Sequence, residues 1–537
     1  MKSLGSRSFR LIPVIAVLIA AGCSSSGQNA QETTGADAGP IQKGGTLTVA
    51  IADDLREPSQ LQAHDSLSRL VMGSTVYDPL FTTDENHKSA PALATGATPS
   101  ADFKTWVFNI REGVKFQDGS VFDANDVKQN LDAIVDPKYA SATAGDIKNV
   151  DSWRVISPTQ IELTLKSPDA DLPATFTDMI FMGNMDSYDE AHPVGTGPYQ
   201  WENRVPGDHI EFKKFAGYWR GEPPLDTVNF KVVDDPQAAA LQLQSGDVDV
   251  LTNDSIASTM LPALKSNPDV TVYETPGATD FHGYTNFEKE RRGGYQDGQK
   301  VRQGLAYLWN PEEMIPNIIG DFGKLSTQPI PDWMTGSDPS IKPWPYREDD
   351  GKRLLAEGGI PAGGTIKILA TDRPYMCQVG AAFQSKLRDV GYDAQFQCLQ
   401  PEVAVKSVQN YDWDVLLWRN SADTTAIRHY QGTWSIGLAG DPPAPPDDVS
   451  TLRDPELQAI LDKMSSTPLD SPDYANLGAQ AAQSIVVKNI ATLPGYFDTA
   501  RIAARKNIHG IVVSPEVYFG FLYNAMGTVW KSKSGTQ

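Results

Sequence analysis

Residues 105–119 read TWVFNIREGVKFQDG. Every second position in the first half of this stretch carries a large apolar side chain: Trp106, Phe108 and Ile110. This period of two predicts a strand with one buried face. Gly113 and Gly119 allow turns with positive φ after the strand, and Asp123 then occupies the N-cap position of a predicted helix. We therefore interpret the stretch as scaffold rather than as a ligand site.

Strands and helices are also predicted on both sides of this stretch. Alternating apolar residues predict three further strands: Thr46–Ile51, Ile161–Leu165 and Val228–Val232. Apolar residues at helical spacing predict helices around residues 127–134, 301–308 and 457–464. A strand–helix–strand unit is predicted from Thr365–Ala370, Val379–Val390 and Ala394–Leu399. Together these elements predict an α/β fold with more than one sheet.

The composition narrows the class of protein. The chain has 537 residues, which suggests three or four structural units of about 150 residues each. Its 46 Lys and Arg against 67 Asp and Glu give a formal net charge of −21. This balance argues against nucleic-acid binding, which needs basic side chains to neutralise phosphates. Three cysteines are too few for a disulfide scaffold or a cysteine-built structural metal site.

The N-terminus has the pattern of an export signal. Basic residues precede an apolar stretch from Leu11 to Ala21, which is too short to cross a hydrocarbon core about 30 Å thick as a helix. The stretch ends in Ala20-Ala21-Gly22-Cys23, which resembles a bacterial lipobox with alanine in place of the usual leucine. We expect a signal peptide at residues 1–22 and a lipidated Cys23, followed by a flexible tether at residues 23–42. An ordinary secretory signal cleaved nearby is the alternative.

No motif of enzyme chemistry stands out. The seven histidines are scattered, and the sequence contains no HExxH, CxxC, P-loop or GxSxG. Paired aspartates such as Asp53-Asp54 are typical of solvated turns rather than of acid/base pairs. We therefore predict a protein that is not an enzyme and has no cofactor and no metal. A secreted hydrolase remains the remote alternative.

A series of short motifs resembles the family 5 extracellular solute-binding proteins, which serve bacterial ATP-driven importers for peptides, nickel chelates and some oligosaccharides. The stretch from residue 105 to residue 127 resembles the signature region of that family. Further matches follow in the family's order: GGTLTVA at 44–50, VYDPL at 76–80, PALA at 91–94, GTGPY at 195–199, GYW at 217–219, SGDVDV at 245–250, VRQGLAY at 301–307 and LPGY at 493–496. Gly304 stands where the family usually has alanine, and the asparagine that commonly opens the GYW segment is missing.

The resemblance implies an α/β fold of two lobes, like the type II periplasmic binding proteins of the large cluster with an extra subdomain. The ligand cleft is expected between the lobes. Lobe one is expected at residues 43–85, 193–277 and 490–537, its extra subdomain at 86–192, and lobe two at 278–489. The hinge is expected to consist of two extended crossings, near Thr275–Thr279 and Ile490–Pro494. A ligand would stabilise the closed state of this hinge.

Two stretches of lobe two are the main candidates for ligand binding. Arg373 and Tyr375 resemble an R-P-Y run of dipeptide-binding members, in which the arginine pairs with the peptide carboxylate. A surface arginine ahead of a helix is the alternative for Arg373. The second stretch follows the predicted strand Val415–Trp418. Peptide-binding members have an aspartate for the ligand's α-ammonium about three residues beyond that tryptophan, where this chain has Ser421, and Asp423 is the nearest acid.

The remaining candidate contacts are aromatic and polar residues of the kind that line such pockets. They are Tyr77, Asp78, Trp418, Asn420 and Trp434. Trp418 and Trp434 would stack on ligand side chains or sugar rings, or else pack in the core. The serine in place of the aspartate and the supply of 11 Trp favour an oligosaccharide as an alternative ligand. A metal chelate is a further alternative, because a chelate needs few protein ligands.

The resemblance implies a substrate-binding lipoprotein that captures oligopeptides or dipeptides. The expected partners are the ligand and the permease subunits of an ABC importer with their ATPases, and no nucleic acid. We expect a monomer outside the cytoplasm, anchored to the cell membrane by its lipid.

The other two cysteines flank the predicted strand–helix–strand unit. Cys377 lies at the start of its helix and Cys398 at the end of its second strand. A helix of about 14 residues returns the chain beside its start, so the spacing allows a bridge. Because an exported protein meets an oxidising compartment, we predict a Cys377–Cys398 disulfide.

Overall fold

The computed structural model of the protein describes residues 40–63, 66–84, 88–177, 180–371, 375–421, 425–434, 450–513 and 525–532. All of these residues belong to one compact unit, residues 36–537. The predicted signal peptide, Cys23 and nearly all of the predicted tether lie outside the described residues. None of the described helices is long and apolar enough to span a membrane.

The largest sheet runs through the whole unit and contains eleven of the described strands, in the order β10-β11-β12-β1-β13-β19-β14-β18-β16-β17, with β15 paired to β19. Their bounds are β1 Thr46–Ile51, β10 Tyr199–Val205, β11 His209–Lys214, β12 Thr227–Val232, β13 Val250–Leu251, β14 Val270–Thr285, β15 Gly323–Ser326, β16 Thr365–Thr371, β17 Asp393–Leu399, β18 Val415–Ser421 and β19 Thr492–Arg505. The predicted strands Thr46–Ile51 and Val228–Val232 are therefore confirmed, as parallel neighbours in this sheet.

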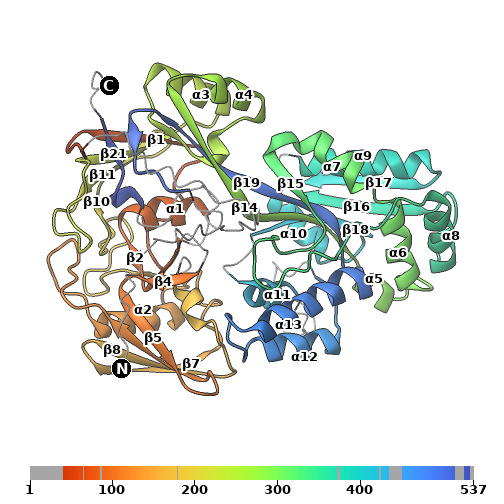
Figure 1. Cartoon of the computed structure of the whole chain (residues 1–537), viewed down its shortest axis with the longest axis horizontal. Helices are drawn as coiled ribbons and strands as arrows, with labels where there is room; N and C mark the ends of the chain where they lie inside the picture. The colour runs from red at the N-terminus through yellow and green to blue at the C-terminus, as the bar shows by residue number, and fades with distance from the viewer. Residues whose placement is uncertain are drawn as a thin grey trace, which may run out of the picture. The chain divides into compact units, whose positions relative to one another are not determined.

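In lobe one, short helices pack against the part of the sheet that runs from β10 to β13. Two cores lie here, one around Leu47, Val49, Phe212 and Phe230, the other around Ala240, Leu243 and Leu264. The helices that cover them are α1 Ser66–Thr75, α3 Pro236–Ser245 and α4 Leu261–Ser266. Figure 1 shows α3 and α4 together at one end of the long strands.

The stretch that begins at Thr105 builds a separate small sheet. Strand β6 (Thr105–Ile110) lies between β5 (Ala94–Pro99) and β8 (Gln160–Leu165), which pairs in turn with β7 (Val150–Ser157). The burial of β6 alternates, with Trp106, Phe108 and Ile110 on the buried face as predicted. Helix α2 (Ala124–Val135) starts at the predicted N-cap Asp123, whose carboxylate accepts the Asn125 N–H at 2.6 Å. This sheet and helix form the core of the extra subdomain.

Lobe two is built on the second half of the sheet. The predicted strand–helix–strand unit is confirmed: β16, α9 (Met376–Asp389) and β17 follow one another, and the two strands are parallel. One face of the sheet packs against α6 (Gly298–Leu308), α7 (Pro311–Ile319), α8 (Glu348–Gly358) and α9. The opposite face packs against α11 (Ala426–Trp434), α12 (Pro455–Met464) and α13 (Pro472–Gln483). We call these the α7–α9 face and the α11–α13 face.

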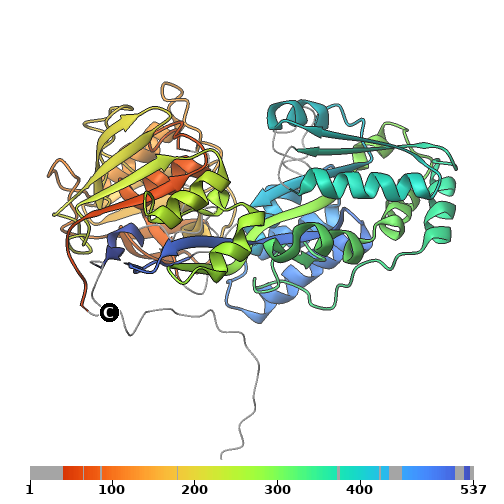
Figure 2. The ribbon, with the colours of Figure 1, turned by 90° about the horizontal axis from the view of Figure 1, so that it is seen from above.

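Two long antiparallel strands join the lobes. In β14 the chain passes from Tyr273, which packs on a lobe-one core, to Tyr284 in lobe two. Figure 2 shows β14 and β19 running side by side from one lobe to the other. In β19, Phe497 packs in the lobe-two core and Ile502 packs in the lobe-one core, so this strand crosses between the lobes from residue 497 to residue 502. The crossing lies there because Pro276 of β14 pairs with Thr499. The second crossing therefore lies several residues after the expected position, Ile490–Pro494. The pairing of β14 with β19 requires both strands to cross between the lobes at the same place.

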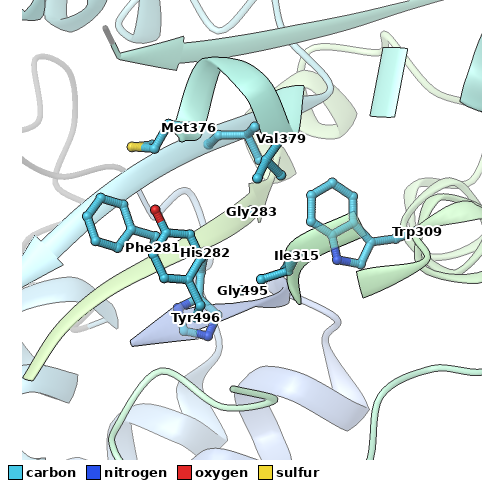
Figure 3. A pocket seen from close by; sticks show the side chains of 10 residues that line it. Phe281, His282, Gly283, Trp309, Ile315, Met376, Val379, Gly495 and Tyr496 are labelled. Atoms are coloured by element: carbon cyan, nitrogen blue, oxygen red, sulfur yellow. The ribbon is translucent and has the colours of Figure 1, made fainter. Parts of the chain in front are cut away.

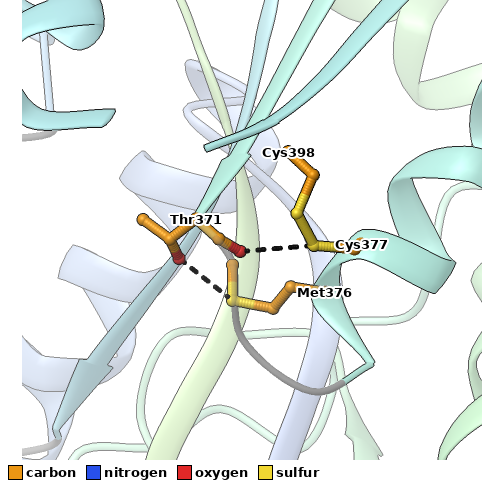
Figure 4. Close-up of a disulfide and its surroundings, with 4 residues drawn as sticks. All are labelled: Thr371, Met376, Cys377 and Cys398. Carbon is orange, nitrogen blue, oxygen red and sulfur yellow. Dashed lines mark hydrogen bonds between the residues drawn. A yellow bond between two sulfur atoms is a disulfide. The ribbon is translucent and has the colours of Figure 1, made fainter. Parts of the chain in front are cut away.

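The structure has the predicted disulfide between Cys377 and Cys398 (Figure 4). The bridge joins the first turn of α9 to β17, with the two Cα atoms 5.6 Å apart. Beside it, the Thr371 hydroxyl donates to Met376 Sδ at 3.6 Å. The disulfide therefore fastens the start of α9 to the edge strand of lobe two.

Candidate ligand site at the crossing between the lobes

Three strands of lobe two end or begin at one edge, close to the crossing. β16 and β18 are parallel and reach this edge at Thr371 and Ser421. The antiparallel β14 enters lobe two here, and its Asp280 lies directly opposite Asn420. Open α/β sheets bind ligands outside the carboxyl ends of their strands. This edge is therefore where a ligand site is expected.

A buried aspartate and a buried histidine lie on β14 at this edge. Asp280 and His282 have fully buried side chains, and His282 Nδ1 lies 3.1 Å from Asp280 Oδ2. An ionised carboxylate only accepts hydrogen bonds, so the Nδ1–H donates. In the neutral ring this leaves His282 Nε2 as an acceptor. The imidazole also meets the ring of Phe497 at 5.9 Å in an edge-on contact.

Next to Asp280 and His282, aromatic side chains lie on the α11–α13 face of the sheet. Tyr284 stacks on Trp434 with ring centroids 6.1 Å apart, and its hydroxyl accepts a hydrogen bond from Asn420 Nδ2. Burial raises the pKa of Tyr284 well above its usual value, and the neighbouring Asp280 acts in the same direction. The Tyr284 hydroxyl therefore stays protonated and uncharged, and its ring lines the site. Trp434 also contacts His429 at 5.7 Å.

Several buried polar atoms in this region have no hydrogen-bond partner in the structure. They are Asp280 Oδ1, His282 Nε2, His429 Nε2, Tyr430 Oη and Trp434 Nε1. Buried polar groups of folded proteins are nearly always paired, because an unpaired group loses its hydration without replacement. A cluster of such atoms at the edge beside the crossing has the character of a site that is completed by another molecule.

The opposite face of the same strands is apolar and closed. Phe281 and Tyr496 stack at 4.5 Å between ring centroids, and the Arg419 guanidinium lies 6.0 Å from the Phe281 ring. A cavity of about 20 Å³ beside them is lined by Trp309, Ile315, Met376 and Val379, among others (Figure 3). It has room for about one water molecule, whereas ligand pockets measure about 300–1,000 Å³. This cavity is a packing defect rather than the ligand site.

The predicted lobe-two candidates partly gather at the polar edge. Asn420 contacts Tyr284 there, and the half-buried Trp418 packs against the α11–α13 core. Tyr375 precedes α9 with a positive φ of 67° and lies 5.7 Å from the Phe322 ring. Arg373, Asp423 and the side chain of Ser421 lie outside the described residues. Their predicted ligand contacts stay predictions.

The other predicted contacts lie inside cores. In lobe one, the Tyr77 hydroxyl receives the Gln60 N–H at 3.2 Å. The Asp78 carboxylate accepts hydrogen bonds from Thr196, Tyr218 and Trp219 at 2.9–3.2 Å. Both side chains are fully buried and provided with partners, as scaffold residues are. Trp434 is 1% exposed and belongs to the α11–α13 core.

The extra subdomain touches lobe two through a small polar contact. Arg428 of α11 lies 3.1 Å from Asp169 and 3.2 Å from Asp171, measured between nitrogen and carboxylate oxygen. Thr425 donates to the Asp171 carboxylate at 2.5 Å, and the Ala170 N–H donates to the Ser465 carbonyl at 2.7 Å. These contacts, which we call the cross-lobe contact, join the extra subdomain to lobe two.

Sequence reasoning missed Asp280, His282 and Arg428. The signal for the first two was present: Asp280 and His282 alternate with Phe281 and Gly283 next to the predicted hinge. In a period-two strand this places two ionisable groups on one buried face, which is unusual without a binding role. Nothing in the local sequence marks Arg428, because its partners come from another subdomain. Among the described residues there is no cluster of three or more His, Cys, Asp or Glu arranged to hold a metal ion.

Comparisons with known proteins agree with this architecture. The family model described as "Bacterial extracellular solute-binding proteins, family 5 Middle" matches residues 88–437. The glutathione-binding protein GsiB of Salmonella paratyphi A is 27% identical over 494 residues, covering 88% of this chain and 93% of GsiB. GsiB of Escherichia coli O157:H7 is 28% identical over 496 residues, with the same coverage of 88% and 93%.

Solved structures share the fold at lower identity. The ABC transporter substrate-binding protein CtaP of Listeria monocytogenes matches with a TM-score of 0.78 at 18% identity, covering 92% of this chain and 100% of CtaP. DppA of Helicobacter pylori in complex with the peptide STSA matches with a TM-score of 0.76 at 22% identity, covering 92% and 99% of the two chains. Both support a two-lobed α/β binding-protein fold for this chain.

Proposed function

Because the chain belongs to the bacterial extracellular solute-binding proteins of family 5, we propose that it binds short peptides outside the cytoplasm and delivers them to an ABC permease. The polar edge beside the crossing carries this proposal. Unpartnered buried acceptors and donors lie there next to the aromatic walls of Tyr284 and Trp434, which is the composition expected of a peptide site. GsiB, which is similar along most of its length, binds glutathione by its name. Glutathione is therefore the first tripeptide to try.

Capture works by closure of the two lobes about β14 and β19. A ligand that touches both walls stabilises the closed state by its differential affinity for that state. The cross-lobe contact of Arg428 with Asp169 and Asp171 also stabilises the closed state. The permease would then recognise the closed protein.

Within the cleft, Arg373 is proposed to pair with the peptide carboxylate, because its fork can donate two hydrogen bonds to the two oxygens. In the sequence it follows the last residue of β16 by two positions. Tyr375, Trp418 and Trp434 are proposed to contact ligand side chains.

The protein is proposed to remain at the outer face of the membrane through lipid on Cys23. A tether of about 20 residues would let the folded unit reach on the order of 25 Å from the anchor. The proposed partners are the permease subunits and their ATPases, with one copy of this chain acting alone.

Calorimetric titration of the mature, unliganded protein tests the ligand class. Glutathione, dipeptides and tripeptides to pentapeptides are titrated, each also with an amidated C-terminus. We expect micromolar or tighter binding of at least one peptide, weakened by amidation and by Arg373→Ala. A folded protein that binds none of these peptides would refute the proposal.

A metal chelate is the second candidate, and one observation favours it. His282 presents a buried ring nitrogen without a partner, and imidazole nitrogen is a common ligand of nickel. Titration with Ni²⁺ alone and with Ni²⁺ plus free histidine decides between the classes. Binding only in the presence of both would favour the chelate over the peptide.

A further inference from the structure

We propose that Phe322 is a positioning residue of the ligand site, because its ring links Tyr375 of lobe two to Arg501 of lobe one. This inference rests on the proposed function, in which Tyr375 contacts the ligand, and adds to it the route by which that contact reaches the crossing between the lobes. The Phe322 ring thereby makes ligand binding and the contact between the lobes depend on each other.

Phe322 belongs to lobe two by its place in the chain but packs on lobe one. It ends a short 3₁₀ turn, η4 (Gly320–Phe322), which joins α7 to β15. Strand β15 starts with Gly323 opposite Asp498 of β19, and so lies beside the crossing. The half-buried ring of Phe322 packs against the lobe-one core around Leu264. Its side chain therefore connects the two lobes at this point.

On the lobe-one side, Phe322 meets a buried arginine with several partners. The Arg501 side chain is 1% exposed, and its guanidinium lies 4.2 Å from the centre of the Phe322 ring. Its Nε donates to Glu274 at 2.7 Å, while its other nitrogens donate to the carbonyl oxygens of Thr499 and Asp321. Since Asp321 immediately precedes Phe322, the arginine holds both the ring and the backbone of the turn. The contact with the ring is a cation–π interaction with a planar cation.

On the lobe-two side, Phe322 contacts a tyrosine with an unfavourable backbone conformation. The ring centroids of Phe322 and Tyr375 are 5.7 Å apart. Tyr375 has φ 67° and ψ −33°, a conformation that residues with a side chain adopt only where their surroundings hold them. Its carbonyl oxygen accepts the Val379 N–H at 2.8 Å, within the first turn of α9. The Phe322 ring is therefore one of the contacts that fix Tyr375 at the start of α9.

A second stack of the same composition lies in lobe two and supplies a matched control. Arg302 is 6% exposed, binds Glu290 at 2.8 Å and lies 3.9 Å from the centre of the Phe287 ring. Phe287 packs in the α11–α13 core, whereas Tyr375 packs against the core of the α7–α9 face. Replacing Phe287 therefore changes a stack of arginine, glutamate and phenylalanine away from Tyr375.

The first test is a double-mutant cycle on peptide affinity. A peptide that binds the wild-type protein is titrated into Phe322→Leu, Tyr375→Ala and the double variant. Leucine keeps an apolar side chain but removes the aromatic face, so we expect affinity to fall by about 3- to 10-fold, the range that one ring contact supplies. With Tyr375→Ala already present, Phe322→Leu should change affinity by less than about twofold, because its effect passes through Tyr375. Phe287→Leu should leave affinity unchanged.

Two results of this cycle would overturn the positioning role and leave peptide binding intact. One is an unchanged affinity in Phe322→Leu. The other is an equal loss of affinity with and without the Tyr375 side chain, which would show that Phe322 does not act through Tyr375. If the folded protein binds no peptide, the proposed function fails, and the second test decides the role of Phe322 by itself.

The second test measures hydrogen exchange without added ligand. Because the Val379 N–H donates to the Tyr375 carbonyl, its exchange rate reports whether Tyr375 keeps its position. We expect Phe322→Leu to speed this exchange by about 3- to 10-fold, and Phe287→Leu to leave it at the wild-type rate. Arg501→Lys keeps the positive charge but loses the planar guanidinium, and should act as Phe322→Leu does. Wild-type exchange at Val379 in Phe322→Leu would show that the ring does not hold Tyr375, and the inference would be wrong.

Discussion

Arg428 of lobe two binds Asp171 of the extra subdomain, with its Nη2 donating to the Asp171 carbonyl oxygen at 2.6 Å. Its Nε lies 3.2 Å from the Asp171 carboxylate, and its Nη2 lies 3.1 Å from Asp169. The two residues are 257 positions apart in the sequence. Since the two residues belong to different lobes, we expect this interaction to stabilise the arrangement in which the lobes are in contact and to be lost when they part.

Replacing Arg428 with alanine should favour the open protein. The guanidinium is 21% exposed and Asp171 is 6% exposed, so truncation leaves a mostly buried carboxylate without its cation. We expect ligand affinity to fall by about tenfold, mainly through faster dissociation. Stopped-flow displacement of bound peptide measures the dissociation rate.

Arg154→Ala is the control for this change. Arg154 makes a bidentate pair with Glu162 on the surface of the extra subdomain, and its side chain is 66% exposed. Surface pairs of this kind contribute little, so both affinity and dissociation rate should match the wild type. Identical kinetics for Arg428→Ala and Arg154→Ala would show that the cross-lobe contact does not hold the cleft closed.

Ligand affinity should depend on pH through Asp171. Burial raises the pKa of Asp171 to about 7, Asp169 acts in the same direction, and Arg428 opposes both. Tyr474 is the other titratable group that faces it, and burial keeps that tyrosine neutral. The open state exposes Asp171 and returns its pKa toward the usual 3.8. Closure therefore takes up a proton between about pH 4 and 7, and affinity should fall with rising pH, by at most about tenfold per pH unit.

Calorimetry in two buffers of different ionisation enthalpy measures this proton uptake near pH 6. Asp171→Asn cannot take up the proton, so its binding should be independent of buffer and nearly flat with pH. Proton release on binding, or the same pH profile in Asp171→Asn, would assign the dependence to another group.

The local elements could be predicted because their signals are local. The alternation around Trp106, the cap at Asp123 and the strand–helix–strand unit at Thr365–Leu399 each depend on neighbours in the sequence. The position of the second crossing could not be predicted in this way. It is fixed by the pairing of Pro276 with Thr499, between strands more than 200 residues apart.

The site was harder to predict than the fold for the same reason. The resemblance directed attention to the strand that ends at Ser421, where the expected aspartate is absent. A buried carboxylate near this end of β18 comes from β14, where Asp280 is paired with Asn420. Arg428 and Asp171 meet only when two subdomains pack together. Such relationships are set by tertiary packing, which a single sequence does not encode in any short pattern.

The disulfide between Cys377 and Cys398 should stabilise lobe two. It closes a loop with a sequence separation of 21, for which chain entropy predicts about 3 kcal/mol of stability. Replacing both cysteines with serine should lower Tm and loosen the start of α9. Because Tyr375 immediately precedes α9, peptide affinity should fall as well. A thiol count on the denatured, unreduced protein should find neither sulfur free.

The close approach of β14 and β19 at the crossing requires a residue without a side chain at position 277. A Cβ atom there would lie 2.0 Å from the Asp498 carboxylate and 2.6 Å from the Asp498 carbonyl oxygen, at the point where β14 and β19 pass between the lobes. Gly277→Ala must therefore push β19 away, at a cost of about 1–3 kcal/mol in unfolding free energy. Gly96→Ala is the matched control, since nothing lies within 4 Å of its added Cβ. Urea denaturation measures stability, and peptide titration of the folded variants measures the effect on closure. We expect Gly277→Ala to lose both stability and affinity, while Gly96→Ala keeps both. Full peptide affinity in a destabilised Gly277→Ala would show that the spacing of the two strands at this point does not control closure.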